Sequence, residues 1–123
     1  MYDAKNAKEG EAKTQLPTDS IIDAIIVDIK DGIVKNFISE EVQKKWQGDI
    51  ESRAIECNLE VKSGEEMVKI TQLFTYTEED GKTVYNPKSN LGKFKTKYKK
   101  LPEHGDQVKV ITNSDGFGKI KLD

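Results

Sequence analysis

The fold is decided by residues 87–122, PKSNLGKFKTKYKKLPEHGDQVKVITNSDGFGKIKL. Ser89 is a typical helix N-cap, and Pro102 and Gly105 end the helix that it begins. A short strand, a tight turn at residues 114–116 and a second strand follow. The stretch therefore predicts a basic amphipathic helix followed by a β-hairpin. The apolar stripe of the helix consists of Leu91, Phe94, Tyr98 and Leu101.

The most hydrophobic run of the chain, residues 21–29, predicts a strand because it is rich in β-branched side chains. It is apolar on both faces, which is typical of a central strand or one that curls around a barrel. Asp31 and Gly32 form a type I′ turn signal, so residues 33–38 are expected to return as the second arm of a hairpin. One face has Ile21, Ile25, Val27 and Ile29, and the other has Ile22, Ala24 and Ile26.

A short helix is predicted at residues 39–46. Ser39 is its N-cap, acidic residues occupy the first turn and lysines the last, as the helix dipole favours. Val42 and Trp46 are four residues apart and are expected to form its buried stripe.

A second hairpin is predicted after this helix. Residues 55–61 alternate between apolar and mainly acidic side chains, and residues 67–77 alternate less cleanly. Asp80 and Gly81 form another type I′ signal, with residues 82–85 as a short returning strand.

The resulting order predicts a mainly β fold, a five-stranded Greek-key barrel. It has a helix between strands 3 and 4 and a short helix inserted between strands 1 and 2. This is the order of the OB-fold. Closely spaced strands also permit an SH3-like barrel or an open α+β sheet, but the helix before the final hairpin favours the OB-fold. Residues 20–123 are expected to form this domain. Residues 1–19, which lack a hydrophobic stripe, are expected to be a flexible arm, with a helix as the alternative.

Composition indicates a soluble globular domain with a thermophile-like share of charged residues, 34% of the 123 residues. The single cysteine, Cys57, excludes an intramolecular disulfide framework and is expected to be an inert core thiol. The first residues resemble neither a signal peptide nor a membrane anchor. The expected location is cytoplasmic.

Charge is divided unevenly along the chain. Residues 1–81 hold ten Lys or Arg and eighteen Asp or Glu, whereas residues 82–123 hold ten and four. Seven lysines and no acid lie between Lys82 and Leu101. This segment offers a binding surface to a polyanion.

Three motifs in the last third carry a resemblance: residues 91–98 (LGKFKTKY), residues 105–110 (GDQVKV) and residues 115–117 (DGF). With the element order of residues 20–122, they resemble small OB-fold single-stranded nucleic-acid-binding proteins of archaea, phages and viruses. The resemblance implies a ligand lying across the second and third strands and their loops.

The expected function is non-enzymatic binding of single-stranded nucleic acid, with DNA favoured over RNA, and without a cofactor or metal. The alternative is a protein-interaction or self-assembly module on the same barrel, including a homo-oligomer. A small hydrolase or nuclease is disfavoured because no acid–base or metal set is recognisable. Candidate nucleic-acid-binding residues are Lys69, Phe74, Tyr76, Lys82, Tyr85, Lys88, Lys93, Lys95, Lys97, Lys99, Lys100, Lys109, Phe117, Lys119 and Lys121.

Purely structural roles remain open for the aromatic residues. Phe94 and Tyr98 share the apolar stripe of their helix and are expected to be core. Tyr76 and Tyr85 flank the second hairpin turn, where they form either a stacking surface or a structural cross-strand pair. Phe117 points outward by strand parity or plugs a barrel end.

Overall fold

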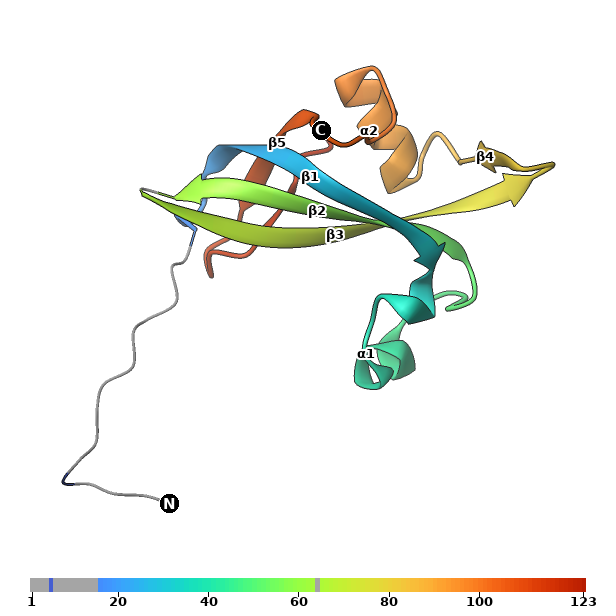
Figure 1. Ribbon diagram of the computed structural model, residues 1–123, viewed down its shortest axis with the longest axis horizontal. Coiled ribbons are helices and arrows are strands. Elements are labelled where there is room, and N and C mark those ends of the chain that lie inside the picture. Colours follow the sequence, from blue (N-terminus) through green and yellow to red (C-terminus); the bar gives the residue numbers. More distant parts are fainter. Residues whose placement is uncertain (1–4, 6–15, 64) are drawn as a thin grey trace.

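The computed structural model describes residues 5, 16–63 and 65–123. Six antiparallel strands form one sheet in the order β4-β3-β2-β1-β5-β6, curled into a half-barrel (Figure 1). The mainly β class is confirmed, with a sixth strand because β4 pairs with the end of β3. The strands are β1 (Ile21–Ile33), β2 (Arg53–Ser63), β3 (Glu66–Glu79), β4 (Lys82–Val84), β5 (Gln107–Thr112) and β6 (Gly118–Ile120). The helices are the 3-10 helix η1 (Val34–Asn36), α1 (Glu40–Lys45) and α2 (Asn90–Tyr98).

The hairpin predicted at Asp31 and Gly32 is wrong. Strand β1 continues through both residues to Ile33, and a 3-10 helix follows instead of a returning strand. Gly32 pairs with Ala54 of β2, and a β-carbon there would lie only 3.0 Å from the ring of Phe37. Close packing against this ring, rather than a turn, therefore favours glycine here.

A β-bulge corrects the predicted faces of β1. Ile26 lies opposite Leu59, but Asp28 lies opposite Asn58. Val27 is therefore an extra residue in β1 with no partner in β2. An inserted residue reverses the alternation of side chains that follows it. Ile29 therefore packs against the same core as Ile26, instead of sharing the opposite face with Ile21.

Helix α1 is present with the predicted cap, since the N–H of Val42 donates to Oγ of Ser39 at 3.3 Å. Its predicted buried stripe is wrong: Val42 is 43% exposed and no residue of α1 is buried. The helix projects away from the sheet with the connection between β1 and β2 (Figure 1). Gln43 attaches it by donating to the carbonyls of Lys35 and Ile38.

Helix α2 has the predicted stripe at Leu91, Phe94 and Tyr98 and seals the core from one side, but it ends at Tyr98, where Lys99 is a left-handed C-cap, so Leu101 lies beyond the helix. Leu91 and Phe94 are fully buried. The rings of Phe94 and Phe74 meet edge to face with centroids 5.8 Å apart, and Tyr98 lies 4.5 Å from Phe94. Such aromatic contacts contribute roughly 0.5–1.5 kcal/mol each beyond simple burial. The expectation that Phe94 and Tyr98 seat the helix is confirmed.

Strand β6, at one end of the curled sheet, approaches β3, which lies next to the other end, without forming a strand pair. The backbone N–H of Ile120 in β6 instead donates to Oε1 of Gln72 in β3, at 2.7 Å. A side chain thus bridges the place where a closed barrel has a backbone ladder.

The expected flexible arm falls mostly on residues 1–4 and 6–15, which lie outside the described residues. Leu16, in contrast, is buried in the core. The hydroxyl of Thr112 donates to the carbonyl of Pro17 at 2.6 Å, and the N–H of Asp19 donates to the carbonyl of Asn113. The packed part of the chain therefore includes residues 16–19. Among the described residues, no helix combines the length and apolarity that a membrane crossing requires.

Candidate functional site

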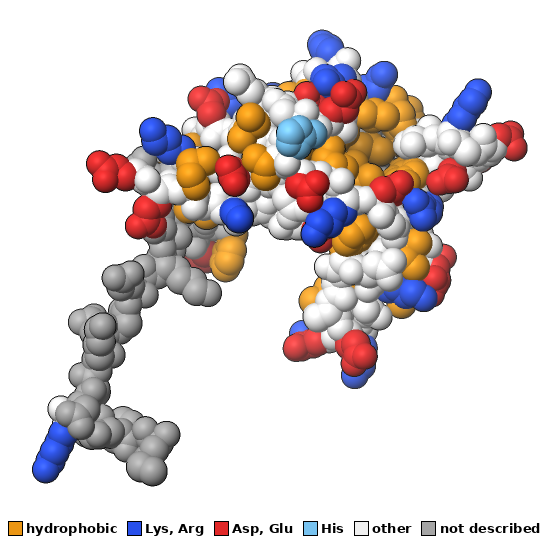
Figure 2. All heavy atoms as spheres, in the orientation of Figure 1, with side chains coloured by type: hydrophobic (Ala, Val, Ile, Leu, Met, Phe, Trp, Pro, Cys, Tyr) orange, Lys and Arg blue, Asp and Glu red, His pale blue; other side chains and the backbone are white. Residues whose placement is uncertain are grey.

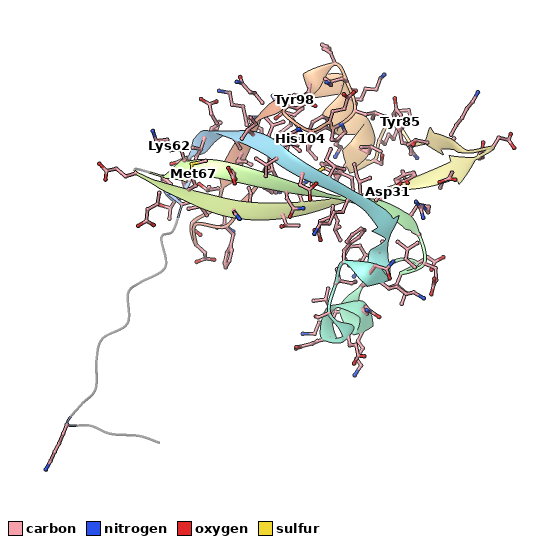
Figure 3. All side chains as sticks on the ribbon, viewed as in Figure 1. Asp31, Lys62, Met67, Tyr85, Tyr98 and His104 are labelled. Carbon is pink, nitrogen blue, oxygen red and sulfur yellow. The ribbon has the colours of Figure 1, made fainter. Side chains whose placement is uncertain are left out.

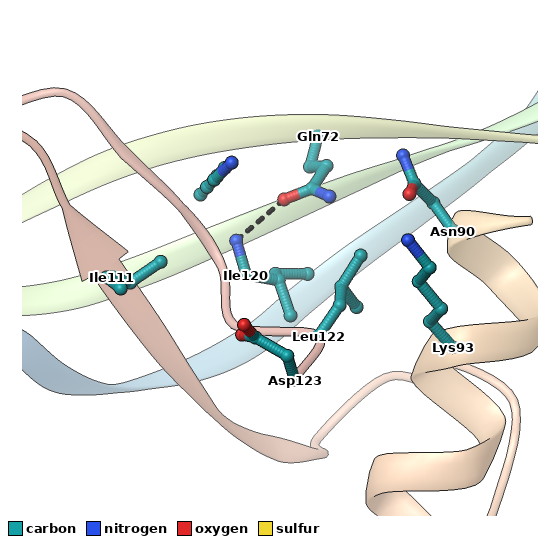
Figure 4. Close-up of a pocket in the computed structure, with 8 residues that line it drawn as sticks. Gln72, Asn90, Lys93, Ile111, Ile120, Leu122 and Asp123 are labelled. Atoms are coloured by element: carbon teal, nitrogen blue, oxygen red, sulfur yellow. Dashed lines mark hydrogen bonds between the residues drawn. The ribbon is translucent and has the colours of Figure 1, made fainter.

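An open groove lies between α2 and the last residues of the chain, beside β3. It consists of two adjoining hollows of about 460 and 650 Å³ that share Lys93, Leu122 and Asp123. Figure 4 shows Asn90 and Lys93 on the α2 side, with Ile120 and Leu122 facing them. We call this surface the basic groove. Its other lining residues are Gln72, Pro87, Lys88, Asn90, Thr96, Lys97, Ile111, Lys119 and Ile120.

The fold fixes the backbone positions of the groove lysines. Lys93 and Lys97 are four residues apart and therefore share one face of α2. Lys119 is exposed because its neighbour Ile120 points into the core of the half-barrel. Lys88 precedes α2 in a turn where its N–H donates to Oδ1 of Asn86, at 2.8 Å.

The charge of the groove is largely uncompensated. Lys88, Lys93 and Lys119 have no acidic partner among the described residues. Lys97 donates to the backbone oxygen of Asp123 at 2.9 Å. The hydrogen bond from Lys121 lowers the pKa of the Asp123 carboxyl, so this group is ionised at neutral pH. The described lining of the groove thus combines four lysines with one acid.

One end of the groove leads to Phe117. A third hollow of about 330 Å³ shares Ile111 and Lys119 with the groove and is lined by Phe117. The ring is 74% exposed, which confirms its outward orientation. Its backbone is nonetheless well held, since Oδ1 of Asn113 accepts hydrogen bonds from the N–H groups of Asp115 and Phe117. An exposed aromatic ring on an ordered turn is suited to stacking.

The other end of the groove leads to Tyr85. A hollow of about 540 Å³ lies between the β3–β4 hairpin and the start of α2, and it shares Pro87 with the groove. We call it the tyrosine pocket. Its lining residues are Ser52, Thr75, Tyr76, Thr77, Val84, Tyr85, Asn86, Pro87 and Ser89.

The structure buries two of the residues predicted to stack on a base. Phe74 is 1% exposed and packs on Phe94, so its ring is not available to a ligand. Tyr76 is 8% exposed, and its hydroxyl donates to Asp31 at 2.6 Å. Both residues are on the inner face of β3, because side chains alternate along a strand and this face packs against the core.

The outer face of β1, β2 and β3, where the resemblance places a ligand, carries mixed charge. Lys69 lies opposite Glu60, and Lys30 lies opposite Glu56. In the view of Figure 2, acidic and basic side chains are interspersed over the molecule. The sheet positions facing outward here therefore form no positive strip.

The remaining predicted lysines lie apart from the groove or have acidic partners. Lys95 and Lys99 are exposed on α2 and at its C-cap but do not line the groove. Lys100 donates to Asp106 at 2.9 Å, and this bond raises the pKa of Lys100. Lys82 is exposed in the β3–β4 hairpin. Lys109 pairs with Asp23, and Lys121 with Asp123.

The sequence analysis missed the neutral polar residues of the groove, Gln72 and Asn90, and its acid, Asp123. Gln72 carries a signal, because it is the polar member of the inner row of β3, between Ile70 and Phe74. A polar residue on an apolar strand face indicates a special partner, here the backbone of Ile120.

The described residues contain no group of three or more His, Cys, Asp or Glu side chains placed to hold a metal ion. Burial raises the pKa of the Cys57 thiol to about 12. The thiol is therefore neutral at physiological pH and is not an activated nucleophile, as expected for a core cysteine.

The chain matches no protein-family model, no curated protein and no solved structure in comparisons with known proteins. The function must therefore be argued from the groove itself.

Proposed function

We propose that this protein binds single-stranded nucleic acid, DNA in preference to RNA, without catalysing a reaction. The observation that carries the proposal is the basic groove, with three unpaired lysines and an exposed or half-buried aromatic residue beyond each end. Proteins that bind single strands combine a positive groove for the phosphates with aromatic side chains for the bases.

The strand order supports an OB-type barrel as the scaffold. Leaving out β4, the sheet runs β3-β2-β1-β5-β6, with α2 between β3 and β5 in sequence. A five-stranded OB barrel has this pairing and places its helix between the third and fourth strands. In this proposal the ligand follows the basic groove, rather than the outer face of the second and third strands.

The arrangement of the lysines around the groove favours a flexible strand. Its lysines come from α2, from the preceding turn and from β6, so they surround a hollow instead of forming a flat basic patch. A single strand can bend so that its phosphates follow such a path, with its bases turned toward Phe117 or Tyr85. We place the protein in the cytoplasm, where its single buried Cys57 suits a reducing environment.

The proposal is tested by fluorescence anisotropy with short labelled oligodeoxynucleotides at low and moderate salt. We expect saturable binding that weakens as salt rises, with a slope of about 0.7 in log Kd against log salt for each phosphate contact. Labelled single-stranded RNA and duplex DNA of matched length serve as comparisons and are expected to bind more weakly. Absence of binding at low salt would contradict the proposal.

A protein-interaction or self-assembly role is the second candidate. It is favoured by the edge of β3, which β4 covers only at residues 77–79, and by Met67, which is 52% exposed near one end of that edge. Uncovered strand edges can pair with a second chain. Light scattering that shows a salt-insensitive oligomer, together with no oligonucleotide binding, would favour this role instead.

A further inference from the structure

The tyrosine pocket differs chemically from the groove that it adjoins. Its lining has no charged side chain, whereas the groove has four lysines. Hydroxyl-bearing residues surround it, and Tyr85 contributes a half-buried ring (Figure 3). A neutral hollow with hydroxyl groups and an aromatic wall suits a planar polar group, which can both stack and form hydrogen bonds there.

Part of the hydrogen-bonding capacity of the pocket is unused. The hydroxyls of Ser52, Thr75 and Tyr85 have no hydrogen-bond partner among the described residues. Strand β4 pairs with β3 only from Thr77 onward, so no strand covers the β3 edge at Thr75. Free hydroxyl groups beside an uncovered strand edge can donate to and accept from a polar planar ligand.

The pocket is close enough to the lysines to be reached by the same molecule. Pro87 lines both the pocket and the groove, and Lys88 follows it directly in the chain. A phosphate held by Lys88 would lie in the hollow that adjoins the pocket, so the neighbouring nucleotide of the same strand would be near the pocket. The turn at residues 86–89, between the pocket and the groove, is held by hydrogen bonds. Ser89 caps α2, and the side chain of Asn86 accepts a hydrogen bond from the N–H of Lys88.

We infer that the tyrosine pocket is a nucleobase site, in which one base of the bound strand stacks on Tyr85 and hydrogen-bonds to the surrounding hydroxyls. The inference rests on the proposed single-strand binding and adds to it that the basic groove and the tyrosine pocket bind different parts of the strand. The groove holds phosphates regardless of the bases, and the pocket holds a base. The protein is therefore expected to distinguish a normal strand from one with the same backbone and no bases.

The test compares a labelled oligodeoxynucleotide with an abasic strand of equal length, which keeps every phosphate and lacks the bases. The wild-type protein is expected to bind the normal strand at least about fivefold more tightly, because a stacked base contributes at least about that factor. Tyr85→Leu is expected to reduce this preference to the part that Phe117 contributes, while Tyr85→Phe keeps the ring and most of the preference. Lys93→Glu is expected to lower the affinity for both strands by a similar factor.

Equal binding of the two strands to the wild-type protein would overturn the base site while leaving the proposed function intact. Absence of binding to either strand would overturn both. Circular dichroism of Tyr85→Leu checks folding, because Tyr85 also packs against the core. In the wild-type protein, photocrosslinking of an iodouracil-substituted strand, followed by mass spectrometry, identifies the residues that contact a base. A crosslink at Tyr85 is expected, and crosslinks confined to other residues would contradict the inference.

Discussion

The basic groove and the outer face of β1, β2 and β3 both contain lysines, but they arrange them differently. On the outer face, Lys30 lies opposite Glu56 and Lys69 lies opposite Glu60, so each of these two lysines has an acid across the strand. The groove gathers lysines from three separate segments around a hollow whose only described acid is Asp123.

We infer from this difference that acids facing the lysines, more than the number of lysines, decide where a surface can attract an anion. Opposite charges across a sheet stabilise the strands and leave little field beyond them. Unpaired lysines around a concave surface reinforce one another and attract a polyanion. We therefore propose that the outer face contributes to stability and that the groove binds the ligand. The following variants test this division.

The largest effect is expected from Gly92→Ala, which disturbs the packing of α2 against the turn before it. A β-carbon at this position would lie 2.4 Å from the carbonyl oxygen of Asn86 and 2.5 Å from that of Pro87. The backbone must shift, so we expect a loss of about 2 kcal/mol or more in the free energy of unfolding, despite the better helix propensity of alanine. Urea denaturation measures it, with exposed Lys95→Ala as the control, expected within about 0.5 kcal/mol of wild type. An unchanged stability of Gly92→Ala would contradict the packing described.

A smaller effect is expected from Asp123→Asn, which should strengthen oligonucleotide binding. The carboxylate of Asp123 opposes a phosphate in the groove, so its neutralisation should strengthen oligonucleotide binding about two- to threefold, as expected for a solvent-exposed charge. Because Lys121 lowers the pKa of this carboxyl, the gain should persist in mildly acidic solution. Anisotropy titration at low salt measures it. Weaker binding by the variant would place the ligand elsewhere.

The smallest effect is expected from the same chemical change on the outer face. Glu56→Gln combined with Glu60→Gln removes two negative charges near Lys30 and Lys69. We expect no more than about a twofold change in affinity, because these charges are outside the groove and are screened by salt. A gain larger than that of Asp123→Asn would move the binding surface to the outer face of the sheet.

Much of the fold could be predicted because local signals agreed with the tertiary structure. The cap at Ser89, the stripe of α2 and the turn at Asp80 and Gly81 are all present, and both turn residues have positive φ. The turn signal at Asp31 and Gly32 failed because pairing with β2 extends β1 past it. The same dipeptide type thus has two outcomes, which only long-range pairing decides.

The site was less predictable than the fold. The basic segment was identifiable from composition, but sequence alone does not show which of its lysines share a concave surface. Phe74 and Tyr76 have the composition of a stacking surface, yet strand parity buries them both. The groove also depends on Gln72, which β3 brings to it from a distant part of the sequence.

The division between groove and remaining surface is tested most directly with two double variants of one helix segment. Lys93→Glu with Lys97→Glu reverses two charges in the groove, whereas Lys95→Glu with Lys99→Glu makes the same change at the same spacing outside it. Anisotropy titration with one labelled single-stranded DNA at moderate salt compares them with wild type. We predict at least about a tenfold loss of affinity for the groove pair and less than about a threefold loss for the other. Equal losses, or a greater loss for Lys95→Glu with Lys99→Glu, would contradict the groove as the binding site.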